Sequence, residues 1–233
     1  MKMAKISIII PVLNEAIAIS TVIKRLGDAS DVEIIVVDGG SQDETVNIAK
    51  SFSVKVISTT PGRASQMNGG AAIATGDILL FLHGDTILPN HFDTLIRETL
   101  QDTRIIAGAF ELRIDSQRRG VRLIERMVKM RSHFLSMPYG DQAIFLKTSI
   151  FQDIGGFPNL PIMEDFELIR CLRKEGKIAI IPALVITSGR RWEKLGVVKT
   201  TLINQLIVAG YFLGIPPEEL VGWYRQTIKL KKY

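Results

Sequence analysis

The segment "LFLHGDT", residues 80–86, places an imidazole and a carboxylate two positions apart at the end of a short apolar run. Residues 80–82 are apolar enough to form a buried strand, so His83 and Asp85 would follow its carboxyl end. Ligands of open α/β sheets bind beyond these strand ends. Asp85 could therefore hold a cation, or it could simply cap the turn into the next helix, because Asp beside Gly and Thr is common in turns.

Further polar residues follow the other predicted strands. Asn14 and Glu15 come after the first strand, and Asp38 ends the second. Because the carboxyl ends of parallel strands meet at one edge of a sheet, we expect these residues to converge with His83 and Asp85. Each has a structural alternative: Asp38 could accept hydrogen bonds from the amides of "GGS", and Glu15 could favour a helix N-terminus. Together, however, several carboxylates repel each other unless a cation or hydrogen-bond donors compensate.

The residue types in this set indicate a hard cation. Oxygen ligands suit Mg²⁺ or Mn²⁺, which bind substrate phosphates, whereas three scattered histidines and one cysteine argue against zinc. We therefore expect Asp85 to hold a divalent cation that bridges to a diphosphate. "GGSQDE" lacks the spacing and the lysine of a P-loop, and the sequence has no GxGxxG motif. The phosphates would then be neutralised by the metal and by Arg63, Arg190 or Arg191.

The elements that would position these residues alternate between strands and helices. Predicted strands span residues 6–10, 32–38, 54–58, 77–82, 105–114, 142–147 and 177–182. Predicted helices span approximately residues 15–26, 39–52, 62–76, 89–100, 118–135 and 164–176. Apolar strands that alternate with helices indicate a mostly parallel sheet covered on both faces. The pattern predicts one continuous α/β domain with a helical C-terminus.

The composition limits the class of protein further. The chain has 233 residues, enough for one large domain, and a net charge of +5. Basic clusters at residues 113–131 and 229–233 would favour phosphates or an anionic membrane surface. No nucleic-acid-binding signature accompanies them and aromatic residues are few, so we expect no nucleic acid partner. The N-terminus has no signal-peptide pattern, which makes a cytoplasmic location the default expectation.

Two helical segments carry separate expectations. Cys171 is the single cysteine, so no intrachain disulfide can form, and we expect it to be a small buried hydrophobe. The longest apolar stretch, residues 195–215, contains Lys199, Asn204 and Gln205, which argues against a helix that spans a bilayer. It could form a core or dimer-interface helix, or it could lie along a membrane surface; packing against protein is favoured.

Four longer motifs carry a resemblance to a known family. The segments "PVLNE" (11–15), "VVDGGSQDET" (36–45), "GRASQMNGGAAIATGDILLFLHGDT" (62–86) and "PIMEDFEL" (161–168) resemble family-2 glycosyltransferases of the GT-A fold. "YGDQAIF" (139–145), "GGFPNLPIMED" (155–165) and "SGRRWEKLG" (188–196) are similar to the small bacterial subgroup often labelled radical-SAM/selenodomain-associated glycosyltransferases. The resemblance covers residues 5–197 and implies a Rossmann-like sheet with helices on both faces.

The resemblance also implies a division of the chain. Residues 1–197 would form the glycosyltransferase domain, with the nucleotide-binding part at about 1–102 and the acceptor part at about 103–197. Residues 198–233 would be a helical extension packed on the same domain.

The resemblance assigns roles to residues that match the family's motifs. It implies nucleotide-sugar binding by Pro11, Asn14, Glu15, Asp38, Arg63, Asn68, His83 and Asp85, with Asp85 as the metal ligand. It implies that Asp165 is the catalytic base, and that Asp141, Gln142 and Glu164 border the acceptor. Arg191 would bind diphosphate, and Trp192 would stack on a sugar or pack in the core. His83 stands where the family's DxD motif has its first aspartate, so we expect it to contact ribose or phosphate, or to bond to backbone.

The reaction implied is inverting transfer of a sugar from a nucleotide diphosphate, with a UDP-sugar favoured, to an acceptor hydroxyl. Mn²⁺ or Mg²⁺ at Asp85 would stabilise the leaving diphosphate. The acceptor could be lipid-linked, the enzyme could contact the inner face of a membrane peripherally, and it could form a homo-oligomer. Two alternatives remain: a sugar-nucleotide nucleotidyltransferase, which normally needs a Gly-rich basic loop after the first strand, and a non-catalytic nucleotide-sugar-binding subunit.

Overall fold

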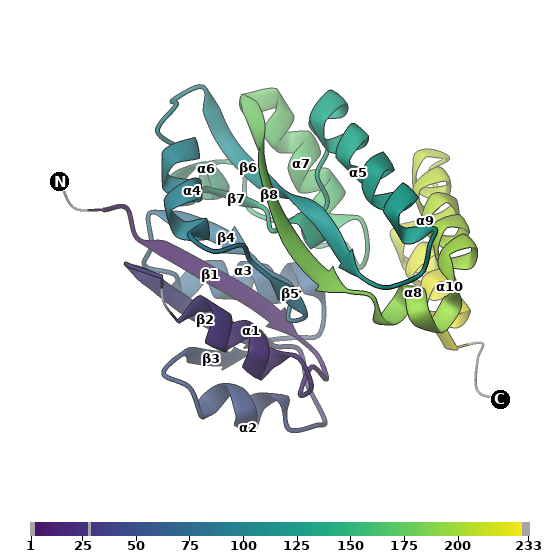
Figure 1. The fold of residues 1–233 in the computed structure, drawn as a ribbon, viewed down its shortest axis with the longest axis horizontal. Helices are drawn as coiled ribbons and strands as arrows, with labels where there is room; N and C mark the ends of the chain where they lie inside the picture. The colour runs from purple at the N-terminus through teal and green to yellow at the C-terminus, as the bar shows by residue number, and fades with distance from the viewer. Residues whose placement is uncertain (1–2, 28, 230–233) are drawn as a thin grey trace.

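A computed structural model describes residues 3–27 and 29–229 of the chain. Within them, one sheet of eight strands runs in the order β3-β2-β1-β4-β7-β6-β8-β5 (Figure 1). The strands are β1 (Ile6–Val12), β2 (Val32–Asp38), β3 (Lys55–Ser58), β4 (Ile78–Phe81), β5 (Thr86–Ile87), β6 (Ile105–Asp115), β7 (Phe145–Lys147) and β8 (Lys177–Ser188).

The sheet is mixed, with a parallel half built from the first four strands. Among the described residues, β1 pairs in parallel with β2 and β4, and β2 pairs in parallel with β3. The short strand β7 is antiparallel to both β4 and β6 and joins this half to the long parallel pair β6–β8. The carboxyl ends of β1, β2 and β4 therefore lie at one edge, as the alternating strand and helix pattern predicts.

Helices cover both faces of the sheet. They are α1 (Ile19–Leu26), α2 (Thr45–Lys50), α3 (Arg63–Ile73), α4 (Phe92–Thr99), α5 (Val121–Leu135), α6 (Thr148–Asp153), α7 (Glu164–Glu175), α8 (Arg190–Leu195), α9 (Val197–Phe212) and α10 (Pro217–Lys229), with a 3₁₀ turn, η1, at Gly140–Gln142. One hydrophobic cluster joins α1, α2, α4 and α5 to the sheet, and a second joins α3, α6, α7, α9 and α10 to its other face.

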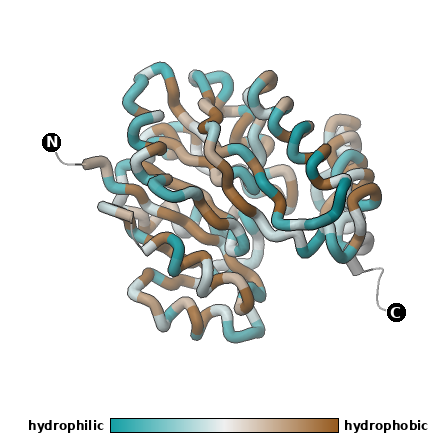
Figure 2. The backbone as a smooth tube through the Cα atoms, viewed as in Figure 1, coloured by the Kyte–Doolittle hydropathy of each residue, from teal (hydrophilic) through white to brown (hydrophobic). Residues whose placement is uncertain are grey.

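Alternation along the strands explains the two clusters. Ile8 and Ile10 of β1 belong to the first cluster, whereas Ile9 between them belongs to the second, because successive side chains of a strand point to opposite faces. All three are fully buried. Figure 2 shows apolar residues along these central strands. Strands apolar on both sides are what a sheet covered on both faces requires.

The C-terminal helices pack on the second face. Ile203 and Ile207 of α9 and Leu220 of α10 are buried there with residues of α7. No helix of the part of the chain described is both long enough and apolar enough to cross a membrane.

Several predicted bounds differ from those observed. The strand predicted at 142–147 begins only at Phe145, because Gly140–Gln142 forms the 3₁₀ turn. The strand predicted at 177–182 continues to Ser188, with a register shift against β6 after Phe110. The shift accommodates Pro182, which has no N–H to donate to the neighbouring strand. Because proline often ends a strand, the local sequence pattern predicted that the strand stops at this residue.

Candidate active site

The loops after β1 and β2 are tied together at the carboxyl edge of the sheet. Asp38, which is 4% exposed, accepts backbone hydrogen bonds from Gly40 at 2.9 Å and Ser41 at 3.1 Å. The Ser41 hydroxyl accepts the Asn14 N–H at 2.9 Å, and the Asn14 side chain accepts the Gln42 N–H at 2.8 Å. Asp38 thus orders its own loop, and the same bonds place Asn14 and the neighbouring Glu15 beside it.

Arg190 joins three strand ends through its guanidinium. Nη2 of Arg190 donates to Oε2 of Glu15 at 2.6 Å and to Oδ2 of Asp85 at 3.0 Å, while Nε donates to the hydroxyl of Ser188 at 3.1 Å. Burial raises the pKa of Glu15, and the contact with Arg190 offsets this only in part. Two carboxylates from distant parts of the chain therefore share one positive charge.

The Glu15 and Asp85 pair fits a divalent cation that relies on its substrate for further ligands. Both carboxylates direct an oxygen at the same cationic nitrogen, so the position accepts positive charge. Within the residues described, no group of three or more His, Cys, Asp or Glu side chains is placed to hold a metal. Two carboxylate ligands are what Mg²⁺ sites commonly take from protein when substrate phosphates complete the coordination.

His83 faces a different neighbourhood from Asp85. A Cβ atom at Gly140 would lie 3.1 Å from Nε2 of His83 and 3.2 Å from Oδ2 of Asp165, so both groups flank this glycine. Burial and the nearby Arg63 guanidinium lower the pKa of His83 to about 3, which keeps the imidazole neutral at pH 7. His83 is therefore placed on the Asp165 side of the site as a neutral polar group.

Asp165 is held by two backbone amides at the start of α7. Its Oδ2 accepts the Gly140 N–H and its Oδ1 accepts the Phe166 N–H, each at 2.7 Å. The two amide hydrogen bonds fix the orientation of the carboxylate at the first turn of the helix. Its side chain is not fully buried, so Asp165 is both oriented and accessible.

Other acidic groups surround Asp165 but differ in burial and charge. Glu164 is 4% exposed and lies 3.7 Å from Nη1 of Arg63, and burial raises its pKa. Burial also raises the pKa of Asp141, and the negative charge of Asp165 adds to this effect. Oδ1 of Asp141 is buried and has no hydrogen-bond partner within the protein. Asp165 is therefore the carboxylate of this group that is both held in a fixed orientation by hydrogen bonds and partly exposed.

Arg191 lies apart from Arg190 and contacts the C-terminal helix. Its guanidinium stacks on the ring of Tyr224 at 4.4 Å and donates to the Tyr224 hydroxyl. Nε and Nη2 of Arg191 are buried without a hydrogen-bond partner within the protein. Burial, with a contribution from Arg63, lowers the pKa of Arg191. Two buried donors without partners are suited to an anionic ligand.

Some residues assigned by resemblance are engaged inside the protein. Gln142 is fully buried, donates to the Phe110 carbonyl at 2.8 Å and accepts from Ser132 at 2.9 Å and Arg131 at 3.1 Å. It therefore supports the turn that carries Asp141 and is not available to an acceptor in this arrangement.

Asn68 and Trp192 also have internal contacts. The Asn68 amide accepts the Phe157 N–H at 2.9 Å and donates to the Phe157 carbonyl at 2.8 Å. Trp192 is partly buried against the first hydrophobic cluster, which was one of its two expected roles. Pro11 lies within β1, opposite Val37 of β2.

Two residues of this region were not predicted from the sequence. Tyr224 lies outside the motifs, in α10. No local sequence pattern indicates where this helix lies relative to Arg191. Tyr139 belongs to the motif "YGDQAIF", which assigns it no role, yet its ring stacks on the Arg131 guanidinium at 3.5 Å and its backbone N–H donates to Gln142. The signal that could have found Tyr139 is its place directly before "GDQ".

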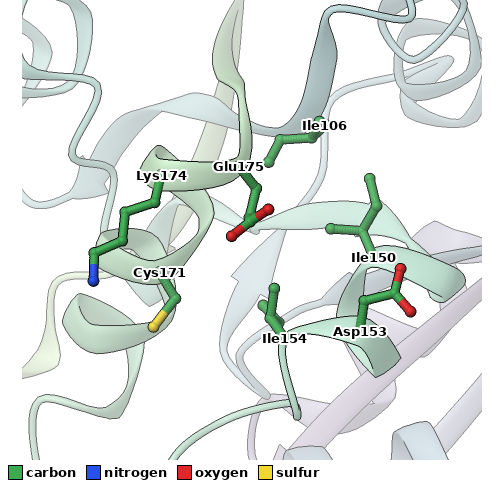
Figure 3. A pocket seen from close by; sticks show the side chains of 7 residues that line it. All are labelled: Ile106, Ile150, Asp153, Ile154, Cys171, Lys174 and Glu175. Atoms are coloured by element: carbon green, nitrogen blue, oxygen red, sulfur yellow. The ribbon is translucent and has the colours of Figure 1, made fainter.

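Two cavities lie away from these residues. One of about 450 Å³ is lined by Ile106, Ile150, Asp153, Ile154, Cys171, Lys174 and Glu175 (Figure 3). The other, of about 910 Å³, lies around Gly76, Arg97 and Lys147. The prediction that Cys171 is buried is wrong, because its side chain is exposed at the first cavity. It lies on the polar side of α7, whose apolar side carries Leu168 and Leu172.

Solved structures share this arrangement of strands and helices. S. aureus TarS superposes with a TM-score of 0.65 at 18% identity, over 79% of the present chain and 36% of its own. Glucosyl-3-phosphoglycerate synthase from Mycobacterium tuberculosis, in complex with Mn²⁺ and UDP-glucose, superposes with a TM-score of 0.60 at 22% identity, over 78% and 70% of the two chains. The fold is that of GT-A glycosyltransferases.

The sequence comparisons identify the family. Residues 7–157 match Glycosyl transferase family 2. A PGL/p-HBAD biosynthesis glycosyltransferase of Mycobacterium bovis (strain BCG / Pasteur 1173P2) is 29% identical over 217 residues, covering 85% of the present chain and 80% of the relative. The chain belongs to glycosyl transferase family 2, and it is a glycosyltransferase.

Proposed function

We propose that the protein transfers a sugar, with inversion, from a nucleoside-diphosphate sugar to an acceptor hydroxyl. The proposal rests on one observation: Asp165 is oriented by two amides beside His83, at the same sheet edge where Glu15 and Asp85 share a positive charge. Transfer needs a base on one side of the anomeric carbon and stabilisation of the leaving diphosphate on the other. The two groups of residues supply these functions.

Asp165 is proposed as the general base. Its two amide hydrogen bonds fix its orientation at the start of α7, and its side chain is partly exposed. It would accept the proton of the acceptor hydroxyl as that oxygen bonds to the anomeric carbon. Asp141, whose buried Oδ1 has no partner within the protein, would accept a hydrogen bond from the acceptor.

Glu15 and Asp85 are proposed to hold Mg²⁺ or Mn²⁺. A cation bound there would supply Lewis-acid stabilisation of the leaving diphosphate. Relatives support the proposal: the mannosyltransferase PcManGT from Pyrobaculum calidifontis, with a TM-score of 0.61 and 18% identity over 80% of this chain and 57% of its own, is in complex with GDP-Man and Mn²⁺.

Basic residues around the cation position are proposed to bind the donor. Arg190 is placed at the strand ends, and Arg191 offers two buried donors. Asp38 and Asn14 order the loops that would border the base of the nucleotide. We keep a UDP-sugar as the favoured donor, in line with the UDP-glucose complex of the relative described above. Membership of the radical-SAM/selenodomain-associated subgroup, and work in the cytoplasm, remain predictions.

A thermal-shift panel followed by turnover tests the proposal. UDP-, GDP- and dTDP-sugars are screened with and without Mn²⁺, and donors that stabilise the protein are then tested for release of nucleoside diphosphate. Metal-dependent stabilisation that Asp85→Ala abolishes, with slow release of UDP, is the expected result. Release of pyrophosphate from a nucleoside triphosphate would instead identify a nucleotidyltransferase. Binding without any consumption of donor, across a panel of acceptors, would identify a non-catalytic subunit.

A further inference from the structure

The outer side of α5 is apolar where a surface helix is normally charged. Leu123, Met127, Met130 and Phe134 are 60%, 50%, 60% and 81% exposed. They follow one another at intervals of four, three and four residues, which puts them on one side of the helix. The opposite side packs against the protein through buried residues such as Val121. The helix therefore has two apolar sides, and one of them faces solvent.

Helix α9 repeats this arrangement. Val198, Leu202 and Leu206 are 73%, 57% and 64% exposed and lie four residues apart, whereas Ile203 and Ile207 on the other side are buried in the core. The two helices start side by side, since a Cβ atom at Gly120 would lie 3.0 Å from Val197. They lie near each other on the same side of the molecule in Figure 1. We call these seven exposed residues of α5 and α9 the apolar face.

The charges on α5 and α9 that are not balanced by an ion pair are positive. Residues 118–135 contain six arginines and lysines, of which Arg118, Arg122 and Lys129 are paired with Glu193, Glu125 and Glu111. Residues 194–213 contain two lysines and no acidic residue. Arg126 lies three residues after Leu123, and Lys199 lies three residues before Leu202, so both exposed cations adjoin the face. Glu125 is already bonded to Arg122 and to the Ile114 N–H.

These observations select the partner. A second copy of the chain docked on this face would bring arginines and lysines together with no free carboxylate on either helix to pair with them. Helices with exposed Leu, Met and Phe side chains and flanking Arg and Lys residues bind instead at the surface of bilayers that contain anionic lipids. We propose that α5 and α9 together form a docking face for an anionic phospholipid membrane.

The inner sides of the same helices contact the acceptor half of the candidate site. Ser132 and Arg131 of α5 bond to Gln142, the neighbour of Asp141, and Tyr211 of α9 contacts the ring of Phe166, the neighbour of Asp165. Docking would thus hold a bilayer near the side from which an acceptor approaches. This geometry suits an acceptor substrate that is carried by the membrane. That inference about the acceptor rests on the proposed function.

Sedimentation with vesicles tests the docking face without any turnover. The full chain is mixed with vesicles of phosphatidylglycerol and phosphatidylcholine at 0.1 M salt, with pure phosphatidylcholine vesicles in parallel. We expect binding to the anionic vesicles that falls as salt rises. Arg126→Gln and Lys199→Gln should each lower the partition coefficient about fivefold, and Met130→Ser with Phe134→Ser should lower it more than tenfold.

Matched variants and a size measurement complete the test. Ile17→Ser removes an equally exposed apolar side chain elsewhere, 88% exposed, and Lys24→Gln with Arg25→Gln removes two exposed charges of α1; these controls should bind vesicles like the wild type. Absence of binding to anionic vesicles, or equal losses in controls and test variants, would overturn the proposal. So would a dimer by light scattering that Phe134→Ser converts to a monomer without vesicle binding. UDP-sugar binding is measured separately, so that a failure of the proposed function is seen independently.

Discussion

At the scale of single residues, two neighbouring arginines illustrate how position decides role. Arg190 bonds to Glu15 and Asp85, and Arg191 bonds to Tyr224. Consecutive residues at the start of a helix point about 100° apart, so one side chain turns to the strand ends and the other to the C-terminal helix. Arg190 therefore compensates carboxylates, whereas Arg191 keeps two buried donors available.

The base assignment leads to the first prediction. Asp165→Asn should fold and bind donor, because the asparagine carbonyl retains one of the two amide hydrogen bonds, at a stability cost of about 1 kcal/mol. Transfer should fall by about 10²- to 10⁴-fold, the usual contribution of a general base. Initial rates and thermal melts check this, with the exposed Asp153→Asn as control. Near wild-type turnover in Asp165→Asn would remove the assignment.

The shared charge at Arg190 leads to the second prediction. Arg190→Ala leaves Glu15 and Asp85 without their guanidinium, so Mn²⁺ should bind more tightly in the absence of nucleotide. The expected change is about fivefold, equivalent to about 1 kcal/mol for a partly exposed ion pair. Titration calorimetry with MnCl₂ measures it. Arg191→Gln is the matched control and should leave Mn²⁺ affinity unchanged; equal or weaker binding by Arg190→Ala contradicts the proposed cation position.

At the scale of elements, a hydrogen-bond network lies at the amino ends of the strands, on the edge of the sheet opposite the candidate site. Glu33 of β2 accepts hydrogen bonds from Ser7 of β1, from the Thr75 N–H before β4 at 2.6 Å and from Lys55 of β3 at 2.9 Å. Burial disfavours its charge, but these bonds outweigh burial and lower the pKa of Glu33 to about 2. One carboxylate thus joins four segments of the parallel half.

This network predicts a pH dependence of stability. Because the folded-state pKa of Glu33 lies below its unfolded value, its contribution is complete above about pH 4.5 and is lost as the pH falls toward 2. Glu33→Gln should lower the free energy of unfolding by about 2 kcal/mol at pH 7, after allowance for screening at the exposed Lys55. Urea denaturation at several pH values should show this gap closing between pH 4.5 and 2. A gap independent of pH would contradict the assignment.

The contact between α10 and α8 gives the fourth prediction. Tyr224→Phe keeps the stacked ring but removes the hydroxyl that orients Arg191. The KM for the nucleotide sugar should rise about fivefold, about 1 kcal/mol for one hydrogen bond, with a smaller change in kcat. Tyr211→Phe, which removes a hydroxyl bonded to Glu167 on α7, is the control. Equal effects of the two substitutions would indicate a general structural cause.

At the scale of the whole molecule, the site depends on segments that are far apart in the sequence. The Glu15–Arg190–Asp85 contacts join the ends of β1 and β4 to the segment after β8, across 175 and 105 residues. Strand β8, which pairs with β6 over its whole length, places the residues after Ser188 beside the ends of β1 and β4. Binding at the site should therefore affect these segments together.

Hydrogen exchange checks this coupling. A stabilising UDP-sugar with Mn²⁺ should slow amide exchange at residues 13–16, 39–42, 83–86 and 188–191 in parallel, because one ligand would contact all of these loops. Amide exchange at residues 150–153 of α6, which lie beside the cavity that Cys171 lines, should not change and serves as an internal control. Protection confined to residues 39–42 would show that the nucleotide binds without engaging the ion-pair cluster.

The sequence by itself determined the parallel half of the sheet and the edge at which the polar residues gather. Apolar runs and the residues that follow them are local features, so Glu15 and Asp85 could be placed at strand ends without coordinates. The tertiary structure alone decided that Arg190 joins them, that Arg191 turns to Tyr224, and that Gln142 is used inside the protein. These outcomes depend on which distant segments meet and on the rotation of each helix about its axis, and no spacing along the chain specifies either.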